Sequence, residues 1–122
     1  MLKYYITPIF LFVIIQALNA KGIFYQDRVL FYVDNEILDF EIKNNQKITS
    51  LENLNDILKD EKVLKVEKWL PMARSTDRNK DIYLSRYFII YLDQKHNDIN
   101  KLVNNVLSLK EITSCEKMPI VS

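Results

Sequence analysis

The order of the expected strands and helices constrains this fold more than any single motif does. Runs rich in β-branched and aromatic residues indicate strands, and two runs with apolar residues at helical spacing indicate helices. After an apolar N-terminus, these runs follow the order strand, helix, strand, strand, helix, strand. In a chain of 122 residues, this order predicts one small α+β domain with a single core.

Each expected element has a local signature. The expected strands cover residues 28–34, 63–70, 83–92 and 112–117, and the expected helices cover residues 50–60 and 98–109. Thr49 and Glu52 have the spacing of a capping box at the start of the first helix. Apolar and acidic residues alternate over 37–42, which indicates an extra N-terminal strand or a continuation of the first strand. Residues 73–82 are polar and lack periodicity, so we expect a mobile hairpin loop there.

One face of the predicted sheet is a candidate binding surface. Right-handed crossovers would place both helices on the same face of a four-stranded antiparallel sheet. In the strand over 83–92, Phe, Ile and Leu at positions 88, 90 and 92 form a row that suits the core. Tyr87, Ile89 and Tyr91 would then lie on the uncovered face, where tyrosine suits an interface. Ordinary cross-strand packing of these tyrosines is the alternative interpretation.

Composition argues against catalysis, cofactor binding and nucleic-acid binding. Gly22 is the only glycine, so no glycine-rich phosphate loop is present. His96 and Cys115 are the only residues of their types, which disfavours a metal site and rules out an intradomain disulfide. We expect Cys115 to be buried because it lies in a strand pattern. Beyond Lys3, the chain carries 16 basic and 16 acidic residues, so no basic field attracts nucleic acid.

The N-terminus has the pattern of a signal peptide over residues 1–20. Lys3 precedes an unbroken apolar run, Ile9–Ile15, and a small residue, Ala20, closes the segment. The run is short of the roughly 20 residues that span a bilayer. Cleavage after Ala20 would leave residues 21–122 as an exported domain, periplasmic or extracellular, without stable membrane contact. Leu18 stands where a small residue is preferred, so an uncleaved N-terminal anchor is the alternative.

Several segments resemble the propeptides of subtilisin-like serine proteases. Ser50–Asn55 and Val66–Pro71 resemble the first helix and second strand of that family, and Leu84–Leu92 resembles its third strand. The helix over 98–109, followed by Ile112–Glu116, resembles the closing segment that leads to the mature protease. The resemblance covers about residues 28–121. It implies a ferredoxin-like βαββαβ prodomain that acts as protease inhibitor and intramolecular chaperone, without catalytic residues of its own.

The resemblance also implies which residues contact the protease. Tyr87, Ile89 and Tyr91 would pack their sheet face on two protease helices, and Glu116 would cap the N-terminus of a protease helix. The tail would lie in the substrate cleft as an extended strand. This cleft-binding tail comprises Lys117, Met118, Pro119, Ile120, Val121 and Ser122. Cys115 and Lys117 depart from the family, which has a small Ala and a Pro at these places.

No protease sequence follows Ser122 in this chain. The resemblance therefore leaves three forms open: a stand-alone inhibitor or chaperone, a separately encoded prodomain, or the product of a truncated reading frame. The protease partner would act in trans in the first two forms and in cis in the third. A different class of function is also open, namely a non-enzymatic periplasmic or extracellular structural domain that self-associates through the open sheet face.

Overall fold

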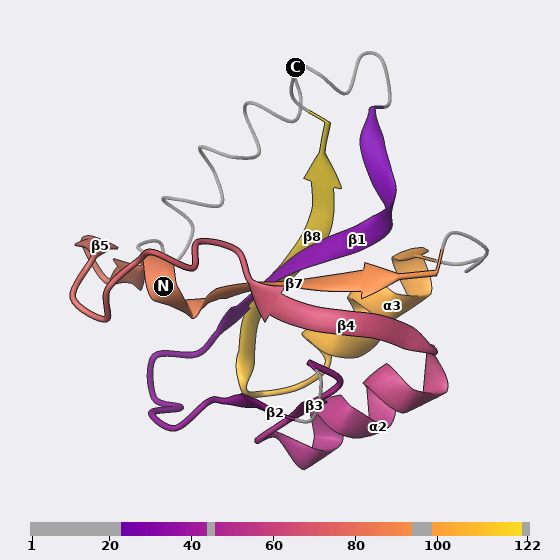
Figure 1. The fold of residues 1–122 in the computed structure, drawn as a ribbon, viewed down its shortest axis with the longest axis horizontal. Coiled ribbons are helices and arrows are strands. Elements are labelled where there is room, and N and C mark those ends of the chain that lie inside the picture. The colour runs from indigo at the N-terminus through magenta and orange to yellow at the C-terminus, as the bar shows by residue number, and fades with distance from the viewer. Residues whose placement is uncertain (1–22, 44–45, 94–98, 121–122) are drawn as a thin grey trace.

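A computed structural model describes residues 23–43, 46–93 and 99–120 and shows an α+β domain (Figure 1). Its main sheet is antiparallel and has four strands in the order β4-β7-β1-β8. These strands are β1 (Phe24–Val33), β4 (Val63–Lys68), β7 (Tyr87–Leu92) and β8 (Ile112–Pro119). The two α-helices are α2 (Glu52–Asp60) and α3 (Ile99–Leu107). The predicted signal peptide and the predictions for His96, Val121 and Ser122 concern residues outside the described ranges.

Five short elements complete the described chain. Strands β2 (Ile42–Lys43) and β3 (Ile48–Thr49) form one two-stranded hairpin, and β5 (Arg78–Asn79) and β6 (Ile82–Tyr83) form another. The 3-10 helix η2 (Leu84–Arg86) leads from β6 into β7. The second hairpin overlaps the segment over 73–82, which was expected to be a mobile hairpin loop, and extends beyond it to Tyr83. The segment therefore contains short paired strands.

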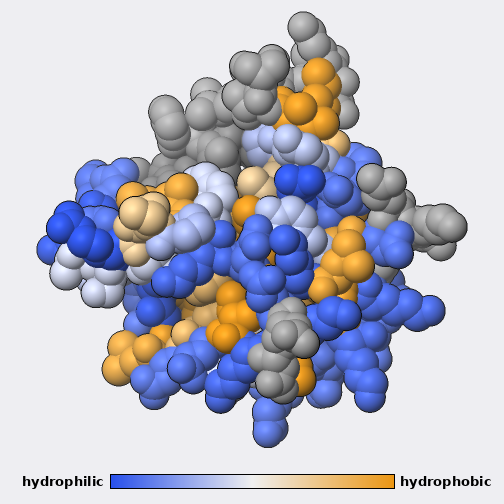
Figure 2. Space-filling view, viewed as in Figure 1, coloured by the Kyte–Doolittle hydropathy of each residue, from blue (hydrophilic) through white to orange (hydrophobic). Residues whose placement is uncertain are grey.

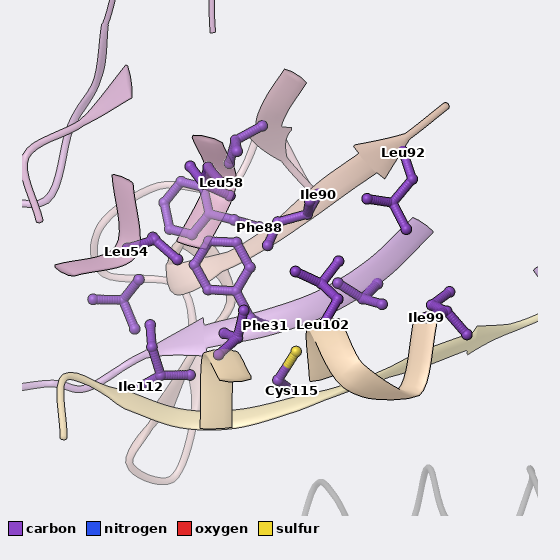
Figure 3. Packing of buried hydrophobic residues seen from close by; sticks show 14 residues of the cluster. Phe31, Leu54, Leu58, Phe88, Ile90, Leu92, Ile99, Leu102, Ile112 and Cys115 are labelled. Carbon is purple, nitrogen blue, oxygen red and sulfur yellow. The ribbon is translucent and has the colours of Figure 1, made fainter. Parts of the chain in front are cut away.

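Both α-helices pack on the same face of the sheet and close the main core (Figure 3). Leu54 and Leu58 extend from α2, and Leu102 extends from α3, toward alternate residues of the central strands. Phe31 of β1 is fully buried and stacks on Phe88 of β7, with ring centroids 5.7 Å apart. The predicted core row of β7 therefore does face the helices. Because side chains alternate along a strand, the tyrosines of β7 face the other way.

The segment over 37–42 does not extend the main sheet as the sequence pattern predicted. Within the described residues, only Ile42 of this segment belongs to a strand, and it pairs with β3. A turn in which Ile37 N donates to Asp34 O, at 3.0 Å, directs the chain away from β1. Phe40 then packs its ring edge against Phe88, with centroids 4.7 Å apart. The alternation of this segment therefore reflects partly buried contacts of Ile37, Phe40 and Ile42 with the main core, not a strand of the main sheet.

Arg86 holds this turn against the end of β1. Its guanidinium donates to the backbone carbonyls of Val33, Asp34 and Ile37, with Nε 2.9 Å from Val33 O. The last carbonyl of β1 and two carbonyls of the turn after it thus accept hydrogen bonds from one side chain, which satisfies backbone groups that the sheet leaves unpaired.

The capping box predicted for Thr49 and Glu52 is wrong. Helix α2 begins at Glu52, and its N-cap residue Leu51 makes no side-chain cap hydrogen bond. Thr49 instead bonds to Asn55, whose amide oxygen lies 2.7 Å from Thr49 N and whose Nδ2 lies 2.9 Å from Thr49 O. The reciprocal pair therefore ties β3 to the side of α2, because the two groups of the Asn55 amide match the backbone N–H and C=O of one residue, Thr49.

Candidate functional site: the second sheet face

The second sheet face, opposite the α-helices, carries its own hydrophobic cluster. Its buried members come from β1, β6 and β7, and its half-buried members lie at the edges of the face. The cluster comprises Leu30, Tyr32, Ile82, Tyr87 and Ile89, with Trp69, Tyr91 and Met118 around them. The structure thus brings Tyr87, Ile89 and Tyr91 together on the face where the sequence placed them. The cluster also contains residues that the strand pattern of β7 alone did not reveal.

Aromatic rings form the centre of the second sheet face. The ring of Tyr87 meets the rings of Tyr32 and Trp69 edge to face, with centroid distances of 4.8 Å and 5.3 Å. Such pairs contribute about 1 kcal/mol each beyond the area they bury. The Tyr32 hydroxyl lies 2.5 Å from Asn35 Oδ1 and accepts a hydrogen bond from Tyr83 N at 2.9 Å. The β5–β6 hairpin is therefore fixed to this face by both packing and hydrogen bonding.

The expectation that this face is bare is wrong at its centre. Tyr87 and Ile89 are only 5% and 6% exposed. Neighbours from β1 and β6 and the ring of Trp69 pack beside them, which a reading of β7 alone could not show. Burial raises the pKa of the Tyr87 hydroxyl well above its ordinary value, with a smaller contribution from nearby Glu116. Of the three predicted contact residues, only Tyr91 is half-buried rather than buried.

Tyr91 lies at a charged border of the face. The Arg28 guanidinium lies 4.9 Å from the centroid of the Tyr91 ring, and the Lys65 ammonium lies 5.0 Å from it. Asp27 pairs with Arg28 at 3.0 Å, and Glu67 pairs with Lys65 at 3.4 Å. Burial and the Glu67 carboxylate raise the pKa of Tyr91. The accessible part of the tyrosine row is therefore surrounded by charges of both signs.

Glu116 brings a carboxylate to the second sheet face. It pairs with Leu30 in the β1–β8 register, while its neighbour Cys115 faces the main core. Burial raises the pKa of Glu116 from its ordinary 4.5 to about 7. Among the described residues, none forms a hydrogen bond or ion pair with this carboxylate. A hydrogen-bond donor stabilises a desolvated carboxylate. The Glu116 carboxylate is therefore suited to accept a hydrogen bond from a donor outside the described residues.

Cys115 is buried, as the sequence predicted, and is 6% exposed. Burial raises the pKa of its thiol far above the ordinary value, and the Glu116 charge adds to this effect. A thiol that stays protonated is a weak nucleophile, so Cys115 packs the core under β8.

The predicted cleft-binding tail is shorter than expected because β8 continues to Pro119. Lys117 pairs with Val29, and Pro119 pairs with Phe24 across β1, so Lys117, Met118 and Pro119 belong to the sheet. Ile120 continues this contact, with its N–H 3.4 Å from Ile23 O. The long β1, which begins four residues before the predicted strand, supplies the pairing partners for this extension.

Comparisons with known proteins identify no relative. No protein-family model matches the chain, and no curated protein sequence or solved structure is significantly similar to it. Across the residues that the structure describes, no helix is both long enough and apolar enough to cross a bilayer. The same residues contain no cluster of three potential metal-ligating side chains. The case for a function therefore depends on the second sheet face and on the sequence resemblance.

Proposed function

We propose that this chain is an exported, prodomain-like module that binds a subtilisin-like serine protease as inhibitor, folding chaperone or both. The observation that carries the proposal is the position of Glu116, a desolvated carboxylate without a described partner, at the edge of an aromatic sheet face. The resemblance to the propeptide family implies that an acidic residue at this position caps the N-terminus of a protease helix. A helix N-terminus carries unpaired N–H groups and partial positive charge, which suits this carboxylate.

The proposal includes a ferredoxin-like arrangement of the domain. The major elements follow the order βαββαβ, and the first and third major strands, β1 and β7, are adjacent in the centre of the sheet. The second and fourth, β4 and β8, form its edges, and both α-helices cover one face. These features support a fold in which the opposite face is available to a partner.

Burial in the free chain refines which residues meet the protease. Tyr91, Glu116 and Met118 are among the half-buried groups of the face, together with Trp69, and would make direct contact. Tyr87 and Ile89, which are buried, would pack against these contact residues without touching the protease themselves. Because 117–119 belong to β8, the segment that enters the substrate cleft would begin at Ile120. A signal peptide over residues 1–20 would direct the domain to the periplasm or the exterior.

Inhibition kinetics test this proposal. The chain should inhibit a purified subtilisin-like serine protease or accelerate its refolding, through an interface of roughly 800 Å² on each partner. Tyr91→Asp should weaken inhibition at least tenfold, because it replaces a contacting ring by a carboxylate, which would lie against the protease helices in addition to that of Glu116. Lys110→Asp, on the turn after α3, is the matched control and should leave inhibition unchanged. Absence of both inhibition and faster refolding with such proteases would exclude the proposal.

A self-associating structural domain is the second candidate. It is favoured by the apolar rings of Trp69 and Tyr91, which are half-buried at the border of the second sheet face. Sedimentation velocity over a hundredfold concentration range distinguishes the two candidates. A dimer that Tyr91→Asp dissociates would support self-association, whereas a monomer at every concentration would exclude it.

A further inference from the structure

We propose that a small hollow at one end of the sheet binds a tetrahedral oxyanion, namely a phosphate or sulfate group. The hollow lies where three segments meet: the turn after β1, the loop after β4, and η2 with the start of β7. In Figure 1, the turn after β1 and the loop after β4 both lie at the left end of the sheet. The site is separate from the second sheet face, so it does not depend on the proposed protease partner.

The size and the lining of the hollow suit one small anionic group. Its volume is about 200 Å³, which is below the roughly 300–1,000 Å³ of pockets that take drug-sized ligands. The buried ring of Phe88 contributes to its apolar surface, and Figure 2 shows hydrophobic side chains between hydrophilic ones below the end of β4. Two cations and two hydroxyls also line the hollow, from Lys68, Arg86, Ser75 and Ser85. No Asp or Glu is among the described residues that line it.

Arg86 brings a half-buried charge without a described counter-ion to the hollow. Its Nε and Nη2 donate to the carbonyls of Val33, Asp34 and Ile37, which occupies three of the five guanidinium N–H groups. Among the described residues, none accepts a hydrogen bond from Nη1, and no carboxylate pairs with this guanidinium. A half-buried cation that only neutral carbonyls contact is stabilised by an anion. Because three hydrogen bonds already fix the plane of the guanidinium, binding at Nη1 costs little further side-chain entropy.

Lys68 supplies a second cation on the same side of the sheet. It pairs with Phe88 in the β4–β7 register, and residues that are paired directly across two strands share a face. Its side chain is exposed, and within the described chain it has no ion-pair partner. Two cations suit a dianion, and a phosphate group carries a charge of about −1.5 to −2 near pH 7. The hydroxyls of Ser75 and Ser85 supply further donors for its oxygen atoms.

An NMR titration with inorganic phosphate tests the site. The full 122-residue chain is titrated at constant ionic strength and about pH 7.5, where phosphate is mostly dianionic because its second pKa is about 6. We expect saturable shifts of the Ser85 amide and Arg86 Nε–H signals, with a Kd of about 1 mM, the affinity that a few charge-assisted hydrogen bonds supply. Sulfate should bind with similar affinity. Acetate should bind about tenfold more weakly, because a monoanion is attracted less strongly by two cations.

Charge reversal at Lys68 provides the decisive variant. Lys68→Glu should weaken phosphate binding about tenfold, because it replaces an attraction by a repulsion, and it retains the core because Lys68 is exposed. Lys110→Glu, on the turn after α3, is the matched charge reversal outside the site and should leave the affinity unchanged. Methyl phosphate distinguishes the sources of the anion: equal affinity would support a site for phosphate esters, and a loss of affinity would support a site for the free anion. Equal phosphate affinity of wild type and Lys68→Glu, or no saturable shifts at about 50 mM phosphate, would overturn the proposal.

Discussion

Replacing Glu116 by Gln should change the pH dependence of stability. Burial holds the pKa of Glu116 at about 7, against an ordinary value of 4.5. A carboxyl whose folded pKa is raised contributes stability below its unfolded pKa, and this contribution is lost as pH rises through the folded pKa. The wild-type chain should therefore lose stability between about pH 4.5 and pH 8, whereas the Gln side chain does not titrate in this window.

The structure sets the size of this effect. The two pKa values differ by about 2.5, and each unit corresponds to about 1.36 kcal/mol, which gives an upper limit of about 3 kcal/mol. Glu116 is half-buried rather than fully buried, so part of this energy is screened by water. We expect Glu116→Gln to gain about 2 kcal/mol relative to the wild type when the pH is raised from 4.5 to 8.5.

Urea denaturation followed by circular dichroism measures this difference at the two pH values. Glu36→Gln, which removes an exposed carboxylate in the turn after β1, is the control and should not reproduce the pH-dependent gain. If the free energies of unfolding of wild type and Glu116→Gln change in parallel between pH 4.5 and 8.5, the desolvation argument is refuted. The same result would remove the main support for Glu116 as a partner-binding group.

Three further predictions concern the core, the turn after β1 and the lone thiol. Phe31→Ala should lower the free energy of unfolding by about 3–5 kcal/mol in urea titrations, because a fully buried ring leaves a cavity. Arg86→Lys should cost about 2 kcal/mol and speed amide exchange at Ile37, because an ammonium lacks the planar fork that reaches several carbonyls. Cys115 should react with a thiol reagent at least a hundredfold faster in urea than in buffer, and equal rates would contradict its burial.

Local patterns were sufficient to predict the major elements and their alternation. Helical spacing of apolar residues located α2 and α3 to within two residues at each end. The alternation of β7 correctly assigned Phe88 to the main core and Tyr87 to the opposite face, because side chains of a strand point to opposite sides in turn. Cys115 was expected to be buried because it lies in a strand pattern, and it packs in the main core.

Contacts between distant segments decided the features that local patterns did not reach. Ile82 and Trp69 help to bury the centre of the second sheet face, and neither lies in the strand whose pattern suggested an open surface. The additional length of β8 depends on pairing with the start of β1, more than ninety positions earlier in the chain. Thr49 bonds to Asn55 rather than to the expected Glu52, because the approach of β3 to α2 places the backbone N–H and C=O of Thr49 opposite the Asn55 amide.

The sequence by itself determined the succession of strands and helices and the two faces of each strand, since both follow from periodicity over a few residues. Only the tertiary structure decided which residues of each face are buried and which carboxylate is desolvated. These properties depend on what a side chain touches across the sheet. The Glu116 carboxylate, on which the proposed function rests, belongs to this second kind.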